Sequence, residues 1–376
     1  MKKICYVVTI PLTIRAFFIP QLKHLANNGF DVTVICSDDE KLQEELGSEI
    51  RYIPVDMPRG MSIKGSVEAI LKLIGIFKQE RFDLVQYSTP NAALYASIAS
   101  KIVGVKVRNY HLMGLRYEGE IGIKRNILKF MEKITCRLST HIECVSYSNM
   151  QIALNDNIFL PSKAIVVWNG STGGVDLSRF DCSKRIEWRE ETREKLGYKE
   201  EDFVYGFVGR ITRDKGIDDL LSAYKMLNTE DKLLIVGKME GEETLNNDLL
   251  NYAKSNNNIQ FHTEVKDIER YYAAVDVLVL PSYREGFGNV VIEAGAVGIP
   301  AIVSEIPGPV DTIEEDKTAY TFKVKDVNEL VEKMRKIRMS DYRKMGDNAS
   351  HFVASQFDSN ILNEKIILRK RGLLKD

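Results

Sequence analysis

The sequence predicts an α/β protein with two doubly wound parallel sheets, each covered by helices on both faces. Short apolar runs alternate with helical patterns from one end of the chain to the other, and this alternation is typical of βαβ units. The most glycine-dense stretch, residues 169–176, interrupts the alternation near the middle, as a connection between domains would. A chain of 376 residues is long enough for two such domains, each with its own core.

The strands expected in the first half are apolar runs at 3–9, 31–36, 51–55, 84–87, 106–109, 141–145 and 164–168. Helices are expected between them at 18–28, 64–79 and 91–103. The N-terminal apolar run is too short for a signal peptide, and Pro11 and Arg15 follow it. We therefore interpret it as the first strand.

The alternation restarts after the glycine-rich stretch, with strands expected at 203–209, 232–236, 259–262, 277–281, 301–303 and 319–324. From Val327 onward the pattern is helical. These elements predict a first domain over residues 1–172, a second over 173–355 and a C-terminal helix over 356–376. The alternative is one large domain in which the glycine-rich stretch forms a loop.

Composition excludes several classes of protein. Apolar residues make up 44% and charged residues 28% of the chain, close to the globular average, so neither disorder nor a fibre is expected. No apolar run approaches the roughly 20 residues that span a bilayer. Residues 1–175 hold 21 Lys and Arg against 16 Asp and Glu, which suggests an anionic partner but is too small an excess for a nucleic-acid binder.

The cysteines and histidines lack the spacing of a metal site. The five cysteines form no CxxC pair, and we expect reduced, buried thiols in a cytoplasmic protein. The five histidines form no HExxH motif. Two acidic pairs, Asp38-Asp39 and Asp218-Asp219, lie where a loop or a helix is expected to begin. We therefore expect no bound metal ion.

Two glutamates frame a segment of the second half that has the pattern of a ligand site. The loop from Glu285 to Asn289 follows a buried strand that stops at Pro281, and Glu293 lies about one turn into the helix that comes next. In an open parallel sheet this strand end binds ligands, and the N–H groups of a helix start favour phosphates. Two acids beside such a backbone suggest a nucleotide-sugar site.

A second segment carries the opposite charge. The strand at 203–209 ends at Gly209-Arg210, and Lys215-Gly216 precedes a helix that is expected to start at Ile217. Two cations together with helix-end amides can balance a diphosphate without a metal. In an unrelated loop the same residues would be ordinary surface charges.

Both segments resemble motifs of the retaining glycosyltransferases with the GT-B fold, especially glycosyltransferase family 4 (group 1). The run Glu-Gly-Phe-Gly-Asn-Val-Val-Ile-Glu-Ala is similar to the two-glutamate motif of that family, and Gly-Arg…Lys-Gly is similar to its diphosphate-binding element. The resemblance covers nearly the whole chain. It implies two Rossmann-like domains that face each other across a cleft, with a C-terminal helix crossing back to the first. The second domain would bind the nucleotide-sugar donor and the first the acceptor.

The resemblance also implies a role for each motif residue. Arg210 and Lys215 would hold the donor diphosphate, and Glu293 would accept hydrogen bonds from the ribose hydroxyls. Glu285 would contact the sugar ring, which makes it a catalytic candidate. The remaining donor-binding candidates are backbone positions near these side chains: Gly209, Gly286, Phe287, Gly288, Asn289 and Val290.

His111 is the second catalytic candidate. It is expected just past a strand end in the first domain, and it is similar to the His-Gly element of the family, which faces the donor sugar. The similarity is inexact because Leu112 and Met113 intervene before Gly114. The alternative is an ordinary loop histidine.

The N-terminal segment departs from the family pattern. Many relatives carry a Gly-Gly pair after the first strand, whereas a bulkier apolar loop is expected here from Thr9 to Phe18, with Arg15 as its one cation. This resembles family members that extend undecaprenyl-diphosphate-linked sugars in capsule, O-antigen and exopolysaccharide synthesis. The acceptor-binding candidates are Arg15, near the lipid phosphate, and Arg116.

An amphipathic helix is expected over residues 123–138. Its apolar stripe runs from Ile123 to Leu138, and five cations lie on the rest of its surface: Lys124, Arg125, Lys129, Lys133 and Arg137. The stripe either packs on the sheet or lies on an anionic membrane surface.

These features predict a retaining, metal-independent glycosyltransferase without a cofactor. The expected partners are a UDP-sugar donor and an undecaprenyl-diphosphate-linked saccharide acceptor, with no nucleic acid, in the cytoplasm or peripherally on the inner face of the cytoplasmic membrane. The alternatives are a nucleotide-sugar epimerase of GT-B shape and a non-catalytic partner subunit. A nicotinamide-dependent dehydrogenase is disfavoured because no GxGxxG follows the first strand.

Overall fold

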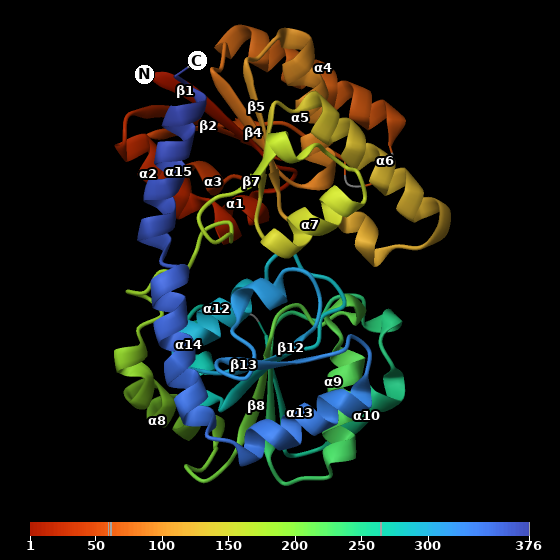
Figure 1. Ribbon diagram of the computed structural model, residues 1–376, viewed down its shortest axis with the longest axis vertical. Helices are drawn as coiled ribbons and strands as arrows, with labels where there is room; N and C mark the ends of the chain where they lie inside the picture. The colour runs from red at the N-terminus through yellow and green to blue at the C-terminus, as the bar shows by residue number, and fades with distance from the viewer. Residues whose placement is uncertain (59, 61, 264, 376) are drawn as a thin grey trace. The chain divides into compact units, whose positions relative to one another are not determined.

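The computed structural model describes residues 1–58, 60, 62–263 and 265–375. The chain forms two compact units (Figure 1). The first contains residues 1–173 and 360–376, and the second contains residues 174–359. The chain thus passes from one unit to the other at Gly173–Gly174, inside the glycine-rich stretch, and returns to the first unit for its last helix.

The first unit is built on a seven-stranded sheet in which every strand pairs in parallel, in the order β3-β2-β1-β4-β5-β6-β7. The strands are β1 (Lys2–Val7), β2 (Phe30–Cys36), β3 (Ile50–Pro54), β4 (Leu84–Tyr87), β5 (Val107–Leu112), β6 (His141–Cys144) and β7 (Ala164–Val166). All seven were predicted from the sequence. The order reverses between β1 and β4, which is the switch point of a doubly wound sheet.

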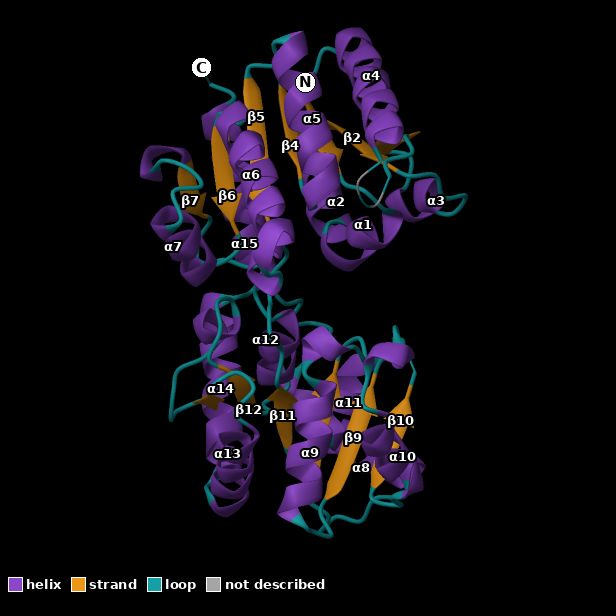
Figure 2. Ribbon diagram, turned by 90° about the vertical axis from the view of Figure 1, so that its right-hand side faces the viewer, coloured by secondary structure: helices purple, strands orange, loops and turns teal. Residues whose placement is uncertain are grey.

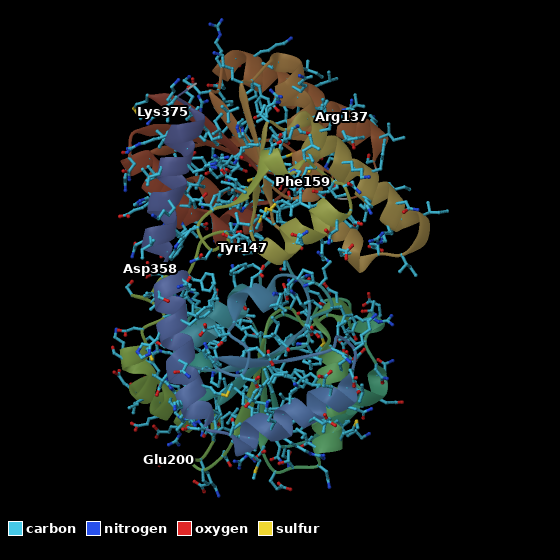
Figure 3. The ribbon with its side chains drawn as sticks, in the orientation of Figure 1. Arg137, Tyr147, Phe159, Glu200, Asp358 and Lys375 are labelled. Atoms are coloured by element: carbon cyan, nitrogen blue, oxygen red, sulfur yellow. The ribbon has the colours of Figure 1, made fainter. Side chains whose placement is uncertain are left out.

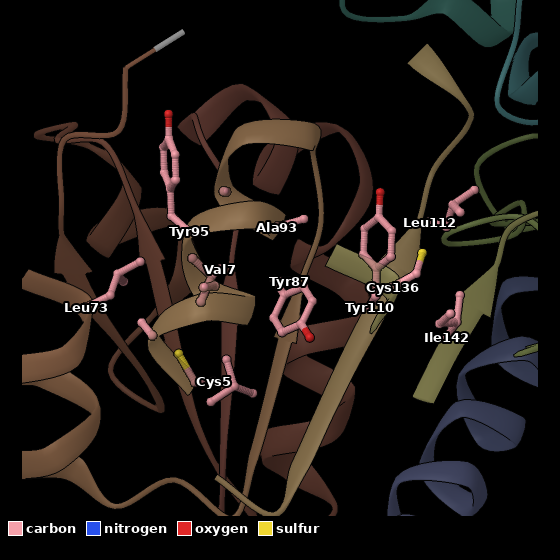
Figure 4. Close-up of a cluster of buried hydrophobic side chains, with 14 of the residues drawn as sticks. Cys5, Val7, Leu73, Tyr87, Ala93, Tyr95, Tyr110, Leu112, Cys136 and Ile142 are labelled. Carbon is pink, nitrogen blue, oxygen red and sulfur yellow. The ribbon is translucent and has the colours of Figure 1, made fainter. Parts of the chain in front are cut away.

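One face of this sheet is covered by α4 (Ile63–Glu80), α5 (Pro90–Val103) and α6 (Gly122–Leu138), with α5 in contact with both neighbours. The helix α5 begins with Pro90 at its first position and ends at Gly104, whose φ of +80° suits a glycine C-cap. The core on this side includes Tyr87 and Tyr110, whose rings stack with centroids 6.0 Å apart (Figure 4).

The other face carries α1 (Pro11–Phe17), α2 (Ile19–Asn27), α3 (Leu42–Leu46) and α15 (Ser359–Leu373). The prediction of a loop from Thr9 to Phe18 is therefore wrong, because α1 occupies most of this segment. Pro11 starts this helix, where its missing N–H costs nothing, and Ile14 is buried. At seven residues the helix is too short to show a clear helical period in the sequence. The unit also contains α7 (Tyr147–Asn155).

The second unit repeats the same winding with six parallel strands in the order β10-β9-β8-β11-β12-β13. They are β8 (Val204–Val208), β9 (Lys232–Val236), β10 (Ile259–His262), β11 (Val277–Leu280), β12 (Ala301–Ser304) and β13 (Ala319–Phe322), again as predicted. The helices α9 (Ile217–Leu227), α10 (Asn247–Ser255) and α13 (Val327–Met339) share a core with one face (Figure 2). The remaining helices are α8 (Arg185–Leu196), α11 (Ile268–Ala274), α12 (Asn289–Ala296) and α14 (Tyr342–Gln356).

Among the described residues, no helix combines the length and the apolar character needed to cross a bilayer.

Candidate active site

The two motif segments of the second unit meet at one edge of its sheet. The strands β8 and β11 are neighbours, and the strand order reverses between them. The loop with Arg210 and Lys215 follows β8, and the loop with Glu285 follows β11. Ligands of open α/β sheets bind at the carboxyl ends of the strands beside this reversal. The fold therefore places both motifs where a nucleotide would bind.

Glycines allow the two loops to pack backbone against backbone. Gly216 has φ +70° and precedes α9, and a Cβ at this position would lie 2.0 Å from the carbonyl oxygen of Pro281. In a third loop, which follows β9, a Cβ at Gly237 would lie 1.9 Å from the carbonyl oxygen of Gly209. The Tyr283 N–H also donates to the Asp214 carbonyl oxygen at 2.9 Å. Larger residues at either glycine would push the loops apart.

Lys215 and Glu285 form an ion pair across these loops. Lys215 Nζ lies 2.5 Å from Glu285 Oε1, and the Ser282 hydroxyl donates to the same oxygen at 2.8 Å. Both charged side chains are more than four-fifths buried. The pair joins the two residues that were predicted to hold the diphosphate and the sugar.

Arg210 has a looser environment. Its side chain is half exposed, and its guanidinium lies 3.2 Å from a Glu240 oxygen and 3.8 Å from an Asp214 oxygen. Exposed pairs of this kind contribute about 0–1 kcal/mol, so an incoming anion can displace them.

Glu293 lies in the second turn of α12 and is oriented by a neighbouring helix. The Tyr272 hydroxyl on α11 donates to Glu293 Oε2 at 2.9 Å. Burial raises the pKa of Glu293 above its usual value, although the Tyr272 hydrogen bond opposes this rise. A carboxylate in this position can accept hydrogen bonds from a diol. Its contact with ribose remains a prediction.

The loop between Glu285 and α12 is held by packing. Phe287 is 5% exposed, and its ring lies edge-on to Phe357 with centroids 5.5 Å apart. The prediction that Phe287 binds the donor therefore concerns its backbone. Gly288 has φ +97° and immediately precedes α12. Asn289 and Val290 begin that helix, so their amides belong to its first turn.

His111 lies within β5 rather than beyond its end, so the predicted loop position is wrong. The strand continues because Tyr110 pairs with β4, and His111 and Leu112 pair with β6. The His111 ring is 7% exposed, its Nε2 lies 3.3 Å from Thr172 Oγ1, and it packs edge-on against Phe18 at 5.6 Å. Burial lowers its pKa to about 4, which makes the imidazole neutral at pH 7.

The two acceptor candidates differ in their surroundings. Arg15 on α1 donates to both oxygens of Asp39 at 2.7 and 2.8 Å and to Glu45 at 2.6 Å. These two carboxylates raise the pKa of Arg15, and they do not favour the prediction that Arg15 binds a phosphate. Arg116 is exposed and begins a 3₁₀ turn in the connection that follows β5.

The predicted residues thus fall into two groups. His111, Arg15 and Arg116 belong to the first unit, whereas the nine donor-binding candidates from Gly209 to Val290, together with Glu293, belong to the second. Sequence reasoning missed the supporting residues Ser282 and Tyr272. Ser282 could have been suspected from its place between the strand and Glu285, but Tyr272 comes from another helix with no spacing signal.

Asp39, in the first acidic pair, is engaged by local hydrogen bonds. Asp39 accepts the N–H groups of Lys41 and Leu42 at 3.0 and 3.1 Å, in addition to Arg15. In the part of the chain that the structure describes, no group of three or more His, Cys, Asp or Glu residues is placed to hold a metal ion.

Two family models match this chain. The model described as glycosyl transferase 4-like matches residues 3–146, and the model described as glycosyl transferases group 1 matches residues 188–352. Together they cover the second sheet and all of the first except β7 and the first residue of β1.

Relatives and solved structures agree with these matches. The capsular polysaccharide biosynthesis glycosyltransferase CapM of Staphylococcus aureus is 30% identical over 100% of this chain and 98% of its own length. A UDP-Gal:α-D-GlcNAc-diphosphoundecaprenol α-1,3-galactosyltransferase of Escherichia coli is 24% identical over 100% of this chain and 96% of its own. Anabaena HepE in complex with UDP and glucose has a TM-score of 0.80 at 18% identity, over 99% of this chain and 100% of its own, and shows the fold alone. This chain therefore belongs to the group 1 (family 4) glycosyltransferases and has their GT-B fold.

Proposed function

We propose that this glycosyltransferase transfers a sugar from a nucleotide-sugar, with UDP as the expected nucleotide, to a saccharide on a lipid diphosphate, with retention at the anomeric carbon. The observation that carries the proposal is the ion pair between Lys215 and Glu285 at the β8–β11 switch point. The name of the Escherichia coli relative, which includes both a UDP-sugar and a diphosphoundecaprenol acceptor, supports the choice of substrates.

The pair provides one group for each half of the donor. When a diphosphate enters, Lys215 exchanges a carboxylate for phosphate oxygens, and Glu285 becomes available to the sugar hydroxyls. Arg210 supplies the second cation. Together they stabilise the charge that develops on the diphosphate as the sugar bond breaks, which is the role that a metal plays in other transferases. The proposed reaction therefore needs no metal ion.

In this proposal the acceptor hydroxyl attacks on the face from which the diphosphate leaves. The bond between the anomeric carbon and the phosphate oxygen breaks, a bond to the acceptor oxygen forms, and the acceptor proton passes to a diphosphate oxygen. His111 is neutral at pH 7 and therefore brings no charge to this step. The proton thus has a destination without a protein base.

A membrane-bound acceptor fits a surface of the first unit that we call the α4–α6 surface. It consists of two exposed apolar stripes at helical spacing, Ile63, Val67 and Leu71 on α4 and Ile123, Ile127 and Phe130 on α6. The interpretation that the α6 stripe packs on the sheet is wrong for its first three members, because Ile123 and Phe130 are 79% and 64% exposed. We propose that this surface rests on an anionic bilayer, which makes the enzyme peripheral.

The donor proposal is tested by melting temperature and transfer together. We expect UDP-sugars to raise the melting temperature more than GDP- or ADP-sugars do, because a ligand that binds only the native state stabilises it. Transfer to an undecaprenyl-diphosphate-linked monosaccharide should survive EDTA, and NMR of the product should show the donor's anomeric configuration. A donor that is isomerised without transfer would indicate an epimerase instead.

The Lys215→Ala variant tests the ion pair. Loss of a cation that meets the developing charge should lower kcat about 100-fold or more, with the fold retained. The matched control is Lys254→Ala, which removes an exposed pair with Glu242 at 2.8 Å in the same unit. Transfer by Lys215→Ala at the control's rate would contradict the proposed site.

A further inference from the structure

A cavity of about 480 Å³, a size that suits a small molecule, opens at the edge of the first sheet where the strands begin. Its lining comes from the start of β1, the passages from α4 to β4 and from α5 to β5, and the end of α15, all within the first unit. Both ends of the chain lie at this edge (Figure 1). Ligands of open α/β sheets usually bind at the opposite edge, beyond the carboxyl ends of the strands. The cavity is therefore separate from the edge where this fold is expected to bind its substrates.

The buried part of the lining is apolar. Phe77, Phe82 and Val105 belong to the core on one face of the sheet, and Leu373 belongs to the core on the other. The rings of Phe77 and Phe82 meet edge to face with centroids 5.9 Å apart. Because packing holds these side chains, the apolar wall exists before any ligand arrives.

The exposed side chains of the lining are cationic: Lys2, Lys78, Arg81 and Lys106. The lining has one carboxylate, Asp83, and it is already engaged. Lys2 Nζ lies 3.3 Å from Asp83 Oδ1, and the Lys3 N–H donates to Asp83 Oδ2 at 2.8 Å. In the part of the chain that the structure describes, Lys78, Arg81 and Lys106 have no ion-pair partner. The cavity thus presents three positive charges that no carboxylate neutralises.

Arg81 holds its charge at this edge at a conformational cost. It caps α4 with φ +54° and ψ +54°, a left-handed conformation that glycine adopts without strain and other residues adopt rarely. The helix α5 ends beside the same cavity with a glycine at its cap, Gly104. The dipole of a helix favours a cation in its last turn, which accounts for Lys78 but neither for a left-handed arginine nor for Lys106 before β5. A bound anion would account for all three charges.

The end of α15 forms a fixed side of the cavity. Lys370 Nζ lies 2.7 Å from Glu143 Oε2 on β6, and Leu373 packs into the core beside β1 and β2. Leu374 follows and is partly exposed at the cavity. A ligand there would contact segments from α4, α5 and α15, which come together only in the folded chain. Its binding should therefore stabilise the native state.

We propose that this cavity binds a phosphate ester that carries an apolar group, with Lys78, Arg81 and Lys106 around the phosphate and the apolar wall against the rest of the molecule. A phosphate monoester carries close to two negative charges at pH 7, and its oxygens accept charge-assisted hydrogen bonds from ammonium and guanidinium groups. Inorganic phosphate would leave the apolar wall unused. Such esters occur free in solution and as lipid headgroups. The site goes beyond the transfer proposed above, because it contains no donor-binding or acceptor-binding candidate.

The probe is octyl phosphate below its micelle-forming concentration, with octyl glucoside as the neutral counterpart. Bound octyl phosphate should raise the melting temperature and shield Lys78 and Lys106 from an amine-acetylating reagent, measured residue by residue by mass spectrometry. The exposed Lys64 and Lys72 of α4 should be acetylated as before. Unchanged acetylation of Lys78 and Lys106, or equal shielding of them by octyl glucoside, would overturn the proposal.

Matched double variants separate the site from general attraction of anions. Lys78→Ala with Lys106→Ala removes two charges at the cavity, and Lys64→Ala with Lys72→Ala removes two exposed charges elsewhere on α4. Calorimetry should show that the first pair raises the Kd for octyl phosphate at least about tenfold and that the second leaves it unchanged. An equal loss of affinity in both would refute the site.

Vesicles distinguish the two sources of the ester. If vesicles of phosphatidylglycerol shield Lys78 and Lys106 and vesicles of phosphatidylcholine do not, the site takes a lipid headgroup. If octyl phosphate shields these lysines and neither vesicle does, it takes a free ester. Acetylation does not depend on transfer, so an enzyme that transferred no sugar would contradict the proposed function and leave this test intact.

Discussion

Glu132 is a carboxyl group in the core between α6 and the first sheet. It is 7% exposed, accepts a hydrogen bond from Tyr110, and its Oε1 has no partner among the described residues. Cys136, one turn along the helix, shares this environment (Figure 4). Burial raises the pKa of Glu132 to about 7, so ionisation of the native state is opposed near neutral pH.

This shift predicts a pH-dependent stability. The unfolded carboxyl releases its proton near pH 4.5 and the folded one near 7, so the native state binds more protons between these values and the free energy of unfolding falls as pH rises. Glu132→Gln should remove this pH dependence. The free energy of unfolding should rise by about 3 kcal/mol at most at pH 8 and change little at pH 4. Urea denaturation at the two pH values measures it, with exposed Glu68→Gln on α4 as control. An equal change in the free energy of unfolding at both pH values would contradict the raised pKa of Glu132.

Individual residues show which parts of the site could be predicted from the sequence and which could not. Glu285 and Lys215 were found because they stand beside glycines at a strand end, but their pairing depends on the close approach at Gly216, which no local pattern encodes. Lys370 was part of a basic helix end in the sequence, and its burial follows from a contact with Glu143 far along the chain. Such long-range polar contacts leave no periodic signal.

At the scale of elements, the strands were predictable and the short helices were not. In the described part of the chain, most of the thirteen strands are apolar runs between turn residues, and each was predicted within a few residues. The helix α1 was missed because it has only about two turns. The predicted β5 stopped before the observed strand does because Asn109 and His111 are polar. Both side chains are buried on a parallel strand, where apolar residues are normal, and this explains why the end of β5 was predicted too early.

The charges on α6 bear on the α4–α6 surface. Lys124, Arg125 and Lys129 already pair with acidic residues, the first at 2.6 Å from Glu120. Of the five cations, only Lys133 and Arg137 have no ion-pair partner in the described part of the chain, and Arg137 is exposed near the end of the helix (Figure 3). Apolar insertion should therefore contribute more to membrane binding than electrostatics does.

This balance gives a prediction for α6. Phe130→Ser together with Ile123→Ser should reduce sedimentation with anionic phospholipid vesicles several-fold, because both side chains are mostly exposed and would be buried in lipid. Lys133→Ala should reduce it less. The control is Ile186→Ser, which removes an exposed isoleucine of α8 in the second unit. Vesicle binding that is unaffected by the α6 substitutions, or equally affected by the control, would place the membrane contact elsewhere.

For the whole molecule, the chain path makes the last helix a part of the first unit. The second unit, residues 174–359, has its own core, whereas Ile367 and Leu373 of α15 pack into the core beside β1 and β2. A chain that ends at Asp358 would lose these contacts and leave Glu143 buried without Lys370, which costs about 3–5 kcal/mol by itself.

We therefore expect truncation at Asp358 to unfold the first unit selectively. Hydrogen exchange followed by mass spectrometry should show lost protection in β4, β5 and β6, while β8 and β11 keep theirs, because the second unit does not depend on α15 for its core. UDP-sugar binding should persist in the truncated chain, since the predicted donor residues all lie in the second unit, whereas transfer should cease. Equal loss of protection in both units would show that they fold as one cooperative body, and full protection in both would show that α15 is dispensable to the first.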